Sequence, residues 1–522
     1  MDPERINYHY CDNLNTDPLP PETKILVTGA NGYVARRLIP ELVARGYFVR
    51  CMVRNRLIPF LFEHPRIEVV YGDCQNKNDL WPILKDIKVA YYLIHSMRAK
   101  QSKFAQIDRQ SAQNFVEVAE ACGTKRIIYL GGLGETNPRL SKHLHSRMEV
   151  GATLSKSRVT VIRLRAAIII GAGSASYELL KSLVQRNRWI PFLEEFNSQC
   201  QPIAIRDVIK YLVGVMELQD LKTRAFHIGG KDIVSYKNLI LRFAKIMNRH
   251  IRIFDTCWVP LPVDVLCRVY AYWLHFFISV PVNIISLLLE SLRTHVVCAD
   301  NDILKLLPFE RLGIDEAVKR ALIREKNSQV FSHWSDVPPA EMKHLLPLSE
   351  YESSDFIIEE HSIEIPASSE KIFQSLIRIG GKRGWFHGNM LWRIRGFIDR
   401  LFGGIGLQRG RRDPVHLRVG DSLDFWRVEK LERNKELLLR AELISPGYSW
   451  LQFELSPGSN HLTKLTLKAH FIPCPPFWGH AYWLLLSKFH SYIFKGMLAH
   501  FYREVTGKDR KTFMERVAAS SP

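Results

Sequence analysis

The chain has 522 residues, of which 46% are hydrophobic and 24% are charged. This length exceeds that of one small domain, and the hydrophobic content excludes an intrinsically disordered protein. Lysine and arginine number 72 against 53 acidic residues, and the resulting net charge of +19 favours anionic partners such as phosphorylated cofactors, lipid headgroups or nucleic acid.

Residues 1–23 form a polar tail that has a proline cluster and no apolar leader segment. The default expectation is therefore a reducing, cytoplasmic compartment. The nine cysteines contain no Cys-x-x-Cys pair, so neither a structural zinc ion nor a disulfide framework is expected, and no metal site is predicted.

From residue 24 onward, short β-branched runs alternate with longer helical runs, which is typical of a parallel sheet covered by helices. Right-handed crossovers between the strands then predict an α/β doubly wound Rossmann sheet. The expected strands are 24–28, 48–53, 67–71, 89–94, 126–130 and 159–164, and the expected helices are 33–44, 79–84, 103–121 and 144–154.

The turn after the first expected strand has glycines at the spacing of a dinucleotide-binding loop. Gly29 permits the tight turn, and Gly32 lets the backbone approach a pyrophosphate that faces the following helix N-terminus. Because the motif lies between a strand and a helix, it predicts dinucleotide binding rather than a merely structural turn. The predicted cofactor-binding residues of this turn are Thr28, Gly29, Asn31, Gly32, Tyr33 and Val34.

Arg54 stands at the end of the second expected strand, where NAD-binding Rossmann domains have an acidic residue. A guanidinium can bind a 2′-phosphate, so NADP(H) is predicted to be preferred over NAD(H). Arg36 and Arg37 are expected to add to this positive field, with ordinary solvated surface as the alternative. Asp73 is expected to contact the adenine end or to serve as a turn residue.

Helical segments replace the alternation after residue 171 and predict a substrate-side lobe, with helices at 177–185, 206–218 and 236–247. The segment 269–289 is nearly apolar and about as long as a membrane span, but His275, Pro281 and Asn283 interrupt it. A pair of buried or membrane-surface helices broken at Pro281 is therefore favoured over a transmembrane helix.

Residues 326–354 lose periodicity and gain prolines, which predicts a linker between a first domain at 24–325 and a second at 355–508, with a tail at 509–522. The second domain is predicted to be an antiparallel sheet wrapped around a long terminal helix. Its expected strands are 356–365, 422–431, 436–443, 450–455 and 462–471, and its expected helices are a short one after Ser368 and a long one at 483–505.

The first domain resembles the atypical, NmrA-like branch of the short-chain dehydrogenase/reductase (SDR) superfamily, through the glycine turn, Gly72-Asp73 and the run 163–171. The resemblance implies an extended SDR-like fold and a Tyr-x-x-x-Lys pair for acid/base chemistry. His143 and Arg147 stand at those two positions here. By this resemblance His143 would act as acid/base and Arg147 would steady the cofactor. The alternative is a polar helix end that only positions the nicotinamide.

The second domain resembles a domain of unknown function that is often fused to such modules and is related to START/polyketide-cyclase-like helix-grip folds. The resemblance lies in 392–396, 403–406, 409–414, 420–428 and the late Tyr482-Trp483 with His490. Helix-grip domains enclose an apolar cavity, which implies a hydrophobic small-molecule ligand. Core packing is the alternative for the aromatic residues. The predicted cavity residues are Trp426, Trp450 and Trp483, accompanied by Phe453, Trp478 and Phe494.

Residues 378–418 contain ten arginines and lysines against two acids, interleaved with aromatic side chains. Together with 266–289, this mixture predicts peripheral contact with an anionic membrane surface, at the inner face of a membrane. Nucleic acid is not favoured, because no recognised motif accompanies the basic residues. The alternative is that Arg409, Arg411 and Arg412 form internal ion pairs with Asp413, Asp421 and Asp424.

These features lead to three hypotheses. The first is an NADP(H)-dependent oxidoreductase or isomerase that acts on a hydrophobic substrate held or presented by the C-terminal domain. The second is a non-catalytic NADP(H)-binding redox sensor or scaffold, because the Tyr-x-x-x-Lys pair is absent. The third is a peripheral protein that handles a lipid or a quinone.

Overall fold

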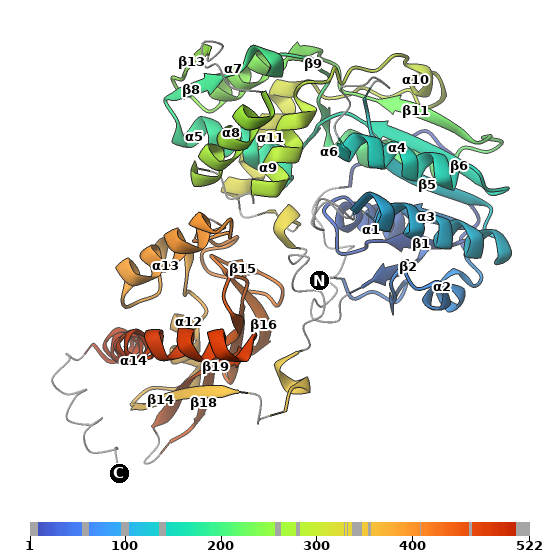
Figure 1. The fold of residues 1–522 in the computed structure, drawn as a ribbon. Helices are drawn as coiled ribbons and strands as arrows, with labels where there is room; N and C mark the ends of the chain where they lie inside the picture. Colours follow the sequence, from blue (N-terminus) through green and yellow to red (C-terminus); the bar gives the residue numbers. More distant parts are fainter. Residues whose placement is uncertain are drawn as a thin grey trace. The chain divides into compact units, whose positions relative to one another are not determined.

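The computed structural model divides the chain into two compact units with a boundary between residues 340 and 341 (Figure 1). We call them the N-terminal unit and the C-terminal unit. The structure describes residues 9–54, 62–94, 104–134, 142–255, 263–277, 282–327, 329–330, 332–336, 347–352, 356–407, 409–458 and 462–507.

A seven-stranded parallel sheet in the order β11-β6-β5-β4-β1-β2-β3 forms the centre of the N-terminal unit. This order reverses direction at β1 and β4, as in a doubly wound Rossmann sheet. The six predicted strands are confirmed, with ends that shift by at most two residues, whereas β11 is not predicted because only one of its five residues is β-branched. The strands are β1 (Lys24–Thr28), β2 (Phe48–Val53), β3 (Ile67–Tyr71), β4 (Val89–Tyr92), β5 (Arg126–Gly132), β6 (Thr160–Ala166) and β11 (Arg224–Ile228).

Helices cover both faces of this sheet (Figure 1). Successive strand residues point to opposite faces, so Ile25 and Val27 pack under the first group of helices while Leu26 packs under the second. The first group is α1 (Ala35–Ala44) and α6 (Ile205–Glu217), and the second is α2 (Lys77–Leu84), α3 (Phe104–Ala121) and α4 (Lys142–Leu154). The carboxyl ends of the strands are left as the edge at which a ligand can bind.

A helical lobe follows, with an apolar core of its own. The segment 269–289 forms parts of two helices whose buried side chains include Leu274 and Ile285, as the favoured interpretation predicts, although Pro281 lies outside the described residues. In the part of the chain that the structure describes, no helix has the length and hydropathy needed to cross a bilayer. The elements of the lobe are β7 (Ile169–Ile170), α5 (Ala175–Arg186), β8 (Trp189–Phe192), β9 (Gln199–Cys200), β10 (Ile203–Ala204), β12 (Val234–Ser235), α7 (Tyr236–Ile246), β13 (Arg252–Asp255), α8 (Val263–Phe277), α9 (Val282–Ser291), α10 (Asp302–Leu306) and α11 (Ile314–Lys326).

The C-terminal unit has a six-stranded antiparallel sheet in the order β14-β19-β18-β17-β16-β15, packed against helices. The predicted sheet and long helix are confirmed. The predicted strand 422–431 is two strands, because Asp424 adopts a positive φ of 54° between them. The long helix begins earlier than predicted, since Pro476 occupies its first turn. The elements are β14 (Ile357–Ile365), α12 (Ser369–Leu376), α13 (Asn389–Leu401), β15 (Ser422–Leu423), β16 (Trp426–Glu432), β17 (Glu436–Ala441), β18 (Gly447–Pro457), β19 (Thr463–Pro473) and α14 (Pro476–Thr506).

A cluster of buried charges lies in the C-terminal unit. The Glu442 carboxylate accepts hydrogen bonds from the guanidinium groups of Arg427 and Arg409, and Arg440 lies 3.9 Å from it. Arg440 also forms an ion pair with Glu429 at 3.3 Å. Charges this deeply buried are tolerated only when paired, so the cluster holds β16, β17 and the segment before β15 together.

Candidate functional site

The glycine turn lies where β1 ends, at the reversal of strand order. Gly29 has a φ of +62°, and a Cβ on it would lie 3.2 Å from the Leu93 carbonyl oxygen. The Thr28 hydroxyl donates to the Tyr91 carbonyl and accepts from the Leu93 amide, each at 3.0 Å, which ties β1 to the end of β4. The turn is therefore fixed on the neighbouring strand.

The same turn fits a pyrophosphate. The Gly32 amide donates to the Gly29 carbonyl at 2.8 Å, and a Cβ on Gly32 would lie 3.0 Å from that oxygen. Val34 occupies the N-cap position of α1, and among the described residues no side chain caps this helix start. The close approach at glycine and the uncapped helix N-terminus are what an anionic diphosphate requires.

Tyr33 and Asn31 are directed at the protein rather than at this space. The Tyr33 ring lies 4.0 Å from the Arg37 guanidinium, and burial raises the pKa of Tyr33 to about 12. The Asn31 side-chain oxygen accepts from Arg36 at 3.2 Å. Of the turn residues predicted to bind the cofactor, Asn31 and Tyr33 therefore stabilise the turn through contacts of their side chains with α1.

Arg36 and Arg37 are not the solvated surface residues of the alternative interpretation, and the predicted contribution of Arg36 to a positive field is offset by an acidic partner. Both side chains are buried. Arg36 forms an ion pair with Asp336 at 2.8 Å, and Arg37 donates to the carbonyl of Ala172 at 2.8 Å and to Ser332. Asp336 neutralises Arg36, whereas Arg37 donates to uncharged oxygens of Ser332 and Ala172. We call residues 332–336 the 332–336 segment.

The 332–336 segment falls within the predicted linker, yet it packs on α1 beside the glycine turn. The Trp334 amide donates to the Gly173 carbonyl at 2.7 Å, and the Ser332 hydroxyl donates to the Tyr33 carbonyl at 3.2 Å. This support is not predicted from the sequence, because no local pattern connects residues about 300 positions apart. The buried arginines of α1 were the only signal, and their burial is not visible in the sequence.

Arg54 and Asp73 meet at the ends of β2 and β3. Arg54 Nη1 lies 3.9 Å from Asp73 Oδ2, and the two side chains are 40% and 34% exposed. Asp73 Oδ1 also accepts from the Gln75 amide at 3.0 Å, so the carboxylate stabilises a turn as well. A long, exposed ion pair is weak, which leaves the Arg54 guanidinium accessible at this edge of the sheet.

Arg147 of α4 is directed at the same edge. Its guanidinium donates to the Leu130 carbonyl of β5 and lies 5.2 Å from the centre of the Tyr129 ring. The backbone of His143 belongs to α4, but its side chain lies outside the described residues. A Cβ on Gly132, the last residue of β5, would lie 2.7 Å from Leu144 Cδ2 of α4, so the end of β5 and α4 pack closely.

The predicted aromatic cavity residues lie on two different faces of the C-terminal sheet. Trp426 belongs to the inner cluster, with ring centres 5.9 Å from Trp385 and 6.4 Å from Trp392. Trp483 packs against that cluster and stacks on Phe471. Trp450 lies on the outer face, where its indole donates to Glu429 at 3.0 Å. It therefore shares no cavity with the other two.

The three aromatic residues that accompany the predicted cavity residues also lie in different environments. Phe453 and Phe494 are buried on the inner face, whereas Trp478 is 65% exposed.

Arg412 pairs with Asp421 at 2.8 Å, as the alternative of internal ion pairs predicts. Arg409 pairs with Glu442 instead, and Asp424 accepts from the Trp385 indole at 2.8 Å. Arg411 donates to backbone carbonyls, among them Ile379 at 2.9 Å.

Within the described ranges, no three His, Cys, Asp or Glu side chains lie close enough together to hold a metal ion. Two family models match the chain. Residues 29–160 match a model described as "NAD(P)H-binding", and residues 355–497 match one described as "Protein of unknown function (DUF2867)". The first match agrees with the glycine turn, so the N-terminal unit contains an NAD(P)-binding Rossmann domain and its cofactor is a nicotinamide dinucleotide.

Curated relatives are similar to part of the chain. The chain is 25% identical over 207 residues to "Ceramide reductase" of Caulobacter vibrioides, which covers 38% of this chain and 65% of that protein. It is 24% identical over 211 residues to "Photosystem II assembly factor Ycf39" of Trieres chinensis, which covers 40% of this chain and 64% of that protein. The chain thus spans slightly less than two thirds of the length of these relatives.

Solved structures are also similar to this chain. "Epimerase Mth375" of Methanothermobacter thermautotrophicus has a TM-score of 0.46 and 12% identity, with 59% of this chain and 93% of that chain covered. The UDP-glucose 4-epimerase of Thermotoga maritima has a TM-score of 0.45 and 12% identity, with 59% and 100% covered.

Proposed function

We propose that this chain is an NADP(H)-dependent oxidoreductase or isomerase that acts on a hydrophobic substrate held or presented by the C-terminal unit. The observation on which the proposal rests is the glycine turn between β1 and α1, tied to β4 by Thr28 and matched by the NAD(P)H-binding model. A bound nicotinamide supplies or accepts a hydride. In this proposal the turn from Gly29 to Val34 binds the dinucleotide, His143 acts as the acid/base, and Arg147 steadies the cofactor.

The preference for NADP(H) rests on Arg54. Its weak pair with Asp73 at 3.9 Å can be exchanged for a charge-assisted hydrogen bond to a 2′-phosphate. Replacing Arg54 with alanine is expected to lower NADPH affinity by about tenfold or more while changing NADH affinity little. Calorimetric titration with both dinucleotides measures the ratio. Lys77→Ala removes the same charge from α2, at a residue paired with Glu117, and is expected to leave both affinities unchanged. An unchanged ratio in Arg54→Ala would remove the basis for the preference.

Two indole groups support a ligand in the C-terminal unit. The Nε1 groups of Trp392 and Trp426 are buried, and neither finds a hydrogen-bond acceptor among the described residues. Buried donors normally have partners, so a ligand with a carbonyl or hydroxyl oxygen would complete this inner face. The antiparallel sheet with α14 packed against it supports a relation to helix-grip folds. Relatives named "Ceramide reductase" and "Sterol-4-alpha-carboxylate 3-dehydrogenase, decarboxylating" support a lipid-like substrate.

A second candidate function is a non-catalytic NADP(H)-binding sensor or scaffold. It is favoured by the contact between Arg147 and the Leu130 carbonyl, which engages the residue at the lysine position, and by Leu144 filling the position beside Gly132. In this function the dinucleotide would bind without turnover.

One substitution separates the two functions. If the chain is an enzyme, His143→Ala is expected to lower NADPH consumption with long-chain aldehydes and ketones by about a hundredfold or more, with NADPH affinity unchanged. His145→Ala, at an exposed position of the same helix, is the matched control and should turn over normally. Turnover that is absent from the native chain, with tight NADPH binding retained, would support the sensor instead.

A further inference from the structure

Two helices of the C-terminal unit turn apolar side chains toward solvent. On α13 the exposed apolar residues recur along one stripe, at Met390, Ile394, Phe397, Ile398 and Leu401. On the first half of α14, residues 476–492, they are Phe477, Trp478, Leu484, Leu485, Phe489 and Tyr492. Leu484 is 77% exposed and Met390 is 74% exposed, which is unusual for side chains of this size.

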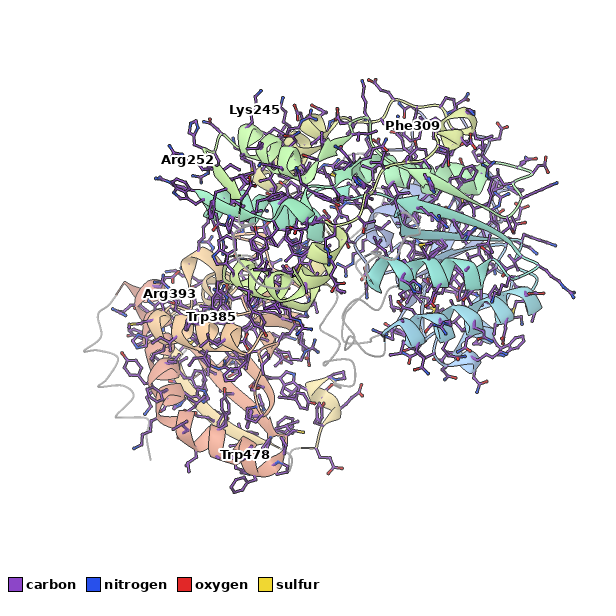
Figure 2. All side chains as sticks on the ribbon, turned by 45° about the horizontal axis from the view of Figure 1, so that its top comes forward. Lys245, Arg252, Phe309, Trp385, Arg393 and Trp478 are labelled. Carbon is purple, nitrogen blue, oxygen red and sulfur yellow. The ribbon has the colours of Figure 1, made fainter. Side chains whose placement is uncertain are left out.

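The two stripes belong to one surface, which we call the α13–α14 face. Arg395 Nε donates to the Tyr482 hydroxyl at 3.3 Å, and the rings of His387 and Tyr492 lie 4.8 Å apart. The first contact places the middle of α13 near Tyr482, and the second places the residue His387, which precedes α13, near Tyr492. The second half of α14 is anchored in the core through residues such as Met497 and Phe501. Trp478 lies at the edge of the C-terminal unit in Figure 2, whereas Trp385 lies within it.

The charges on this face have a single sign. Arg393, Lys488 and Lys495 are exposed, and α14 contains no acidic residue before Glu504. The one acid of α13, Asp399, is buried and accepts hydrogen bonds from the amides of Gly406 and Ile444. An apolar face surrounded by basic residues, with Trp and Tyr among its apolar side chains, has the composition that anionic lipid headgroups and the adjoining acyl chains attract.

We propose that the α13–α14 face docks on the surface of an anionic lipid bilayer without crossing it. The large apolar side chains enter the boundary between headgroups and acyl chains, and the lysines and arginines contact the headgroup phosphates. A second copy of the chain fits this face less well, because it would bring the basic side chains Arg393, Lys488 and Lys495 of both copies into one interface. The segment 266–289, for which membrane contact is also predicted, has Leu274, Ile284 and Ile285 in the core of the N-terminal unit, whereas Val269 and Tyr272 of α8 are exposed.

Sedimentation of the full chain with vesicles tests this proposal. The chain is expected to sediment with phosphatidylglycerol–phosphatidylcholine vesicles and much less with phosphatidylcholine alone. The double variant Leu484→Glu, Leu485→Glu should lower partitioning by at least about tenfold. Lys488→Glu should lower it on anionic vesicles by at least about fivefold and leave the neutral vesicles unchanged. Trp81→Glu, at a residue 46% exposed on α2, is the matched control and should sediment as the native chain does.

Three results would overturn the proposal. The native chain could stay in the supernatant with anionic vesicles. The double variant could sediment as well as the native chain, which would place the contact elsewhere. Light scattering could show a dimer that the double variant splits, which would assign the face to a second copy. Thermal unfolding of each variant establishes whether it is folded. If the double variant does not fold, Lys488→Glu, which changes one exposed side chain, still tests the proposal. None of these results depends on dinucleotide binding.

Discussion

Replacing Gly29 with alanine is expected to weaken nicotinamide dinucleotide binding by at least about a hundredfold. Alanine at a φ of +62° is strained, and its Cβ would lie 3.2 Å from the Leu93 carbonyl oxygen, so the turn must open. Opening moves Gly32 and the start of α1, which supply the backbone donors for the pyrophosphate. Fluorescence titration with NADPH measures the loss.

Gly123→Ala is the matched control for this prediction. Gly123 also has a positive φ, of +73°, but a Cβ there would meet nothing within 4 Å, and the residue follows α3 far along the chain from the turn. Both variants should lose similar stability from backbone strain, and only Gly29→Ala should lose affinity. Equal affinity in the two variants would show that the glycine turn does not bind the cofactor.

Replacing Glu442 with glutamine is expected to destabilise the C-terminal unit by about 3–5 kcal/mol. The carboxylate is completely buried and faces three guanidinium groups, those of Arg409, Arg427 and Arg440. A neutral amide removes the negative charge that Arg409 and Arg427 face, whereas Arg440 keeps its ion pair with Glu429 at 3.3 Å. Urea unfolding followed by tryptophan fluorescence measures the difference, since Trp426 and Trp450 lie close to the cluster in β16 and β18.

The same carboxylate makes stability depend on pH. Burial alone would raise the pKa of Glu442, but Arg427 and Arg409 lower it more, and the pKa lies well below its ordinary value. The stabilisation is therefore fully present above the unfolded-state pKa of about 4.3 and is lost as pH falls toward the folded-state pKa. The native chain should lose stability on acidification below about pH 4.5, and Glu442→Gln should lose less over that range.

Glu432→Gln serves as the control for both measurements. Glu432 lies at the end of β16 in solvent and pairs with Lys435. Exposed pairs contribute little, so its unfolding midpoint should match that of the native chain. If Glu442→Gln behaved like Glu432→Gln, the buried charge cluster would not be what holds β16 and β17 in place.

Patterns that depend on neighbouring residues predict most of this fold. β1 to β6 are short runs rich in apolar residues, and α14 is a long apolar helix, so local sequence patterns locate them. α13 is not predicted, because glycines precede and follow it and its three arginines interrupt its apolar residues. Periodicity also does not say which side of a helix is buried, and on α13 the apolar stripe faces solvent.

For the candidate site too, features formed by neighbouring residues are predicted from the sequence, and contacts between residues far apart in the sequence are not. The glycine turn is contiguous in sequence, and its place between β1 and α1 is predicted, but the contacts of Asn31 and Tyr33 with Arg36 and Arg37 are not. The surroundings of Arg36 depend on Asp336, and no local signal connects them. Trp450 could have been placed better, since it stands three residues before Phe453 on one strand and an odd spacing puts two side chains on opposite faces. Alternation within β18 was therefore the available signal for excluding Trp450 from the inner cluster.

The ion pair between Arg36 and Asp336 has a consequence for biosynthesis. The two residues are 300 positions apart, so at about 5–20 residues per second roughly 15–60 s pass between their emergence from the ribosome. Until then the nascent Rossmann domain holds a buried guanidinium without its carboxylate. A fragment that ends at residue 325 lacks Asp336 and therefore cannot form this ion pair. A fragment designed to produce the N-terminal unit by itself should therefore extend at least to residue 336.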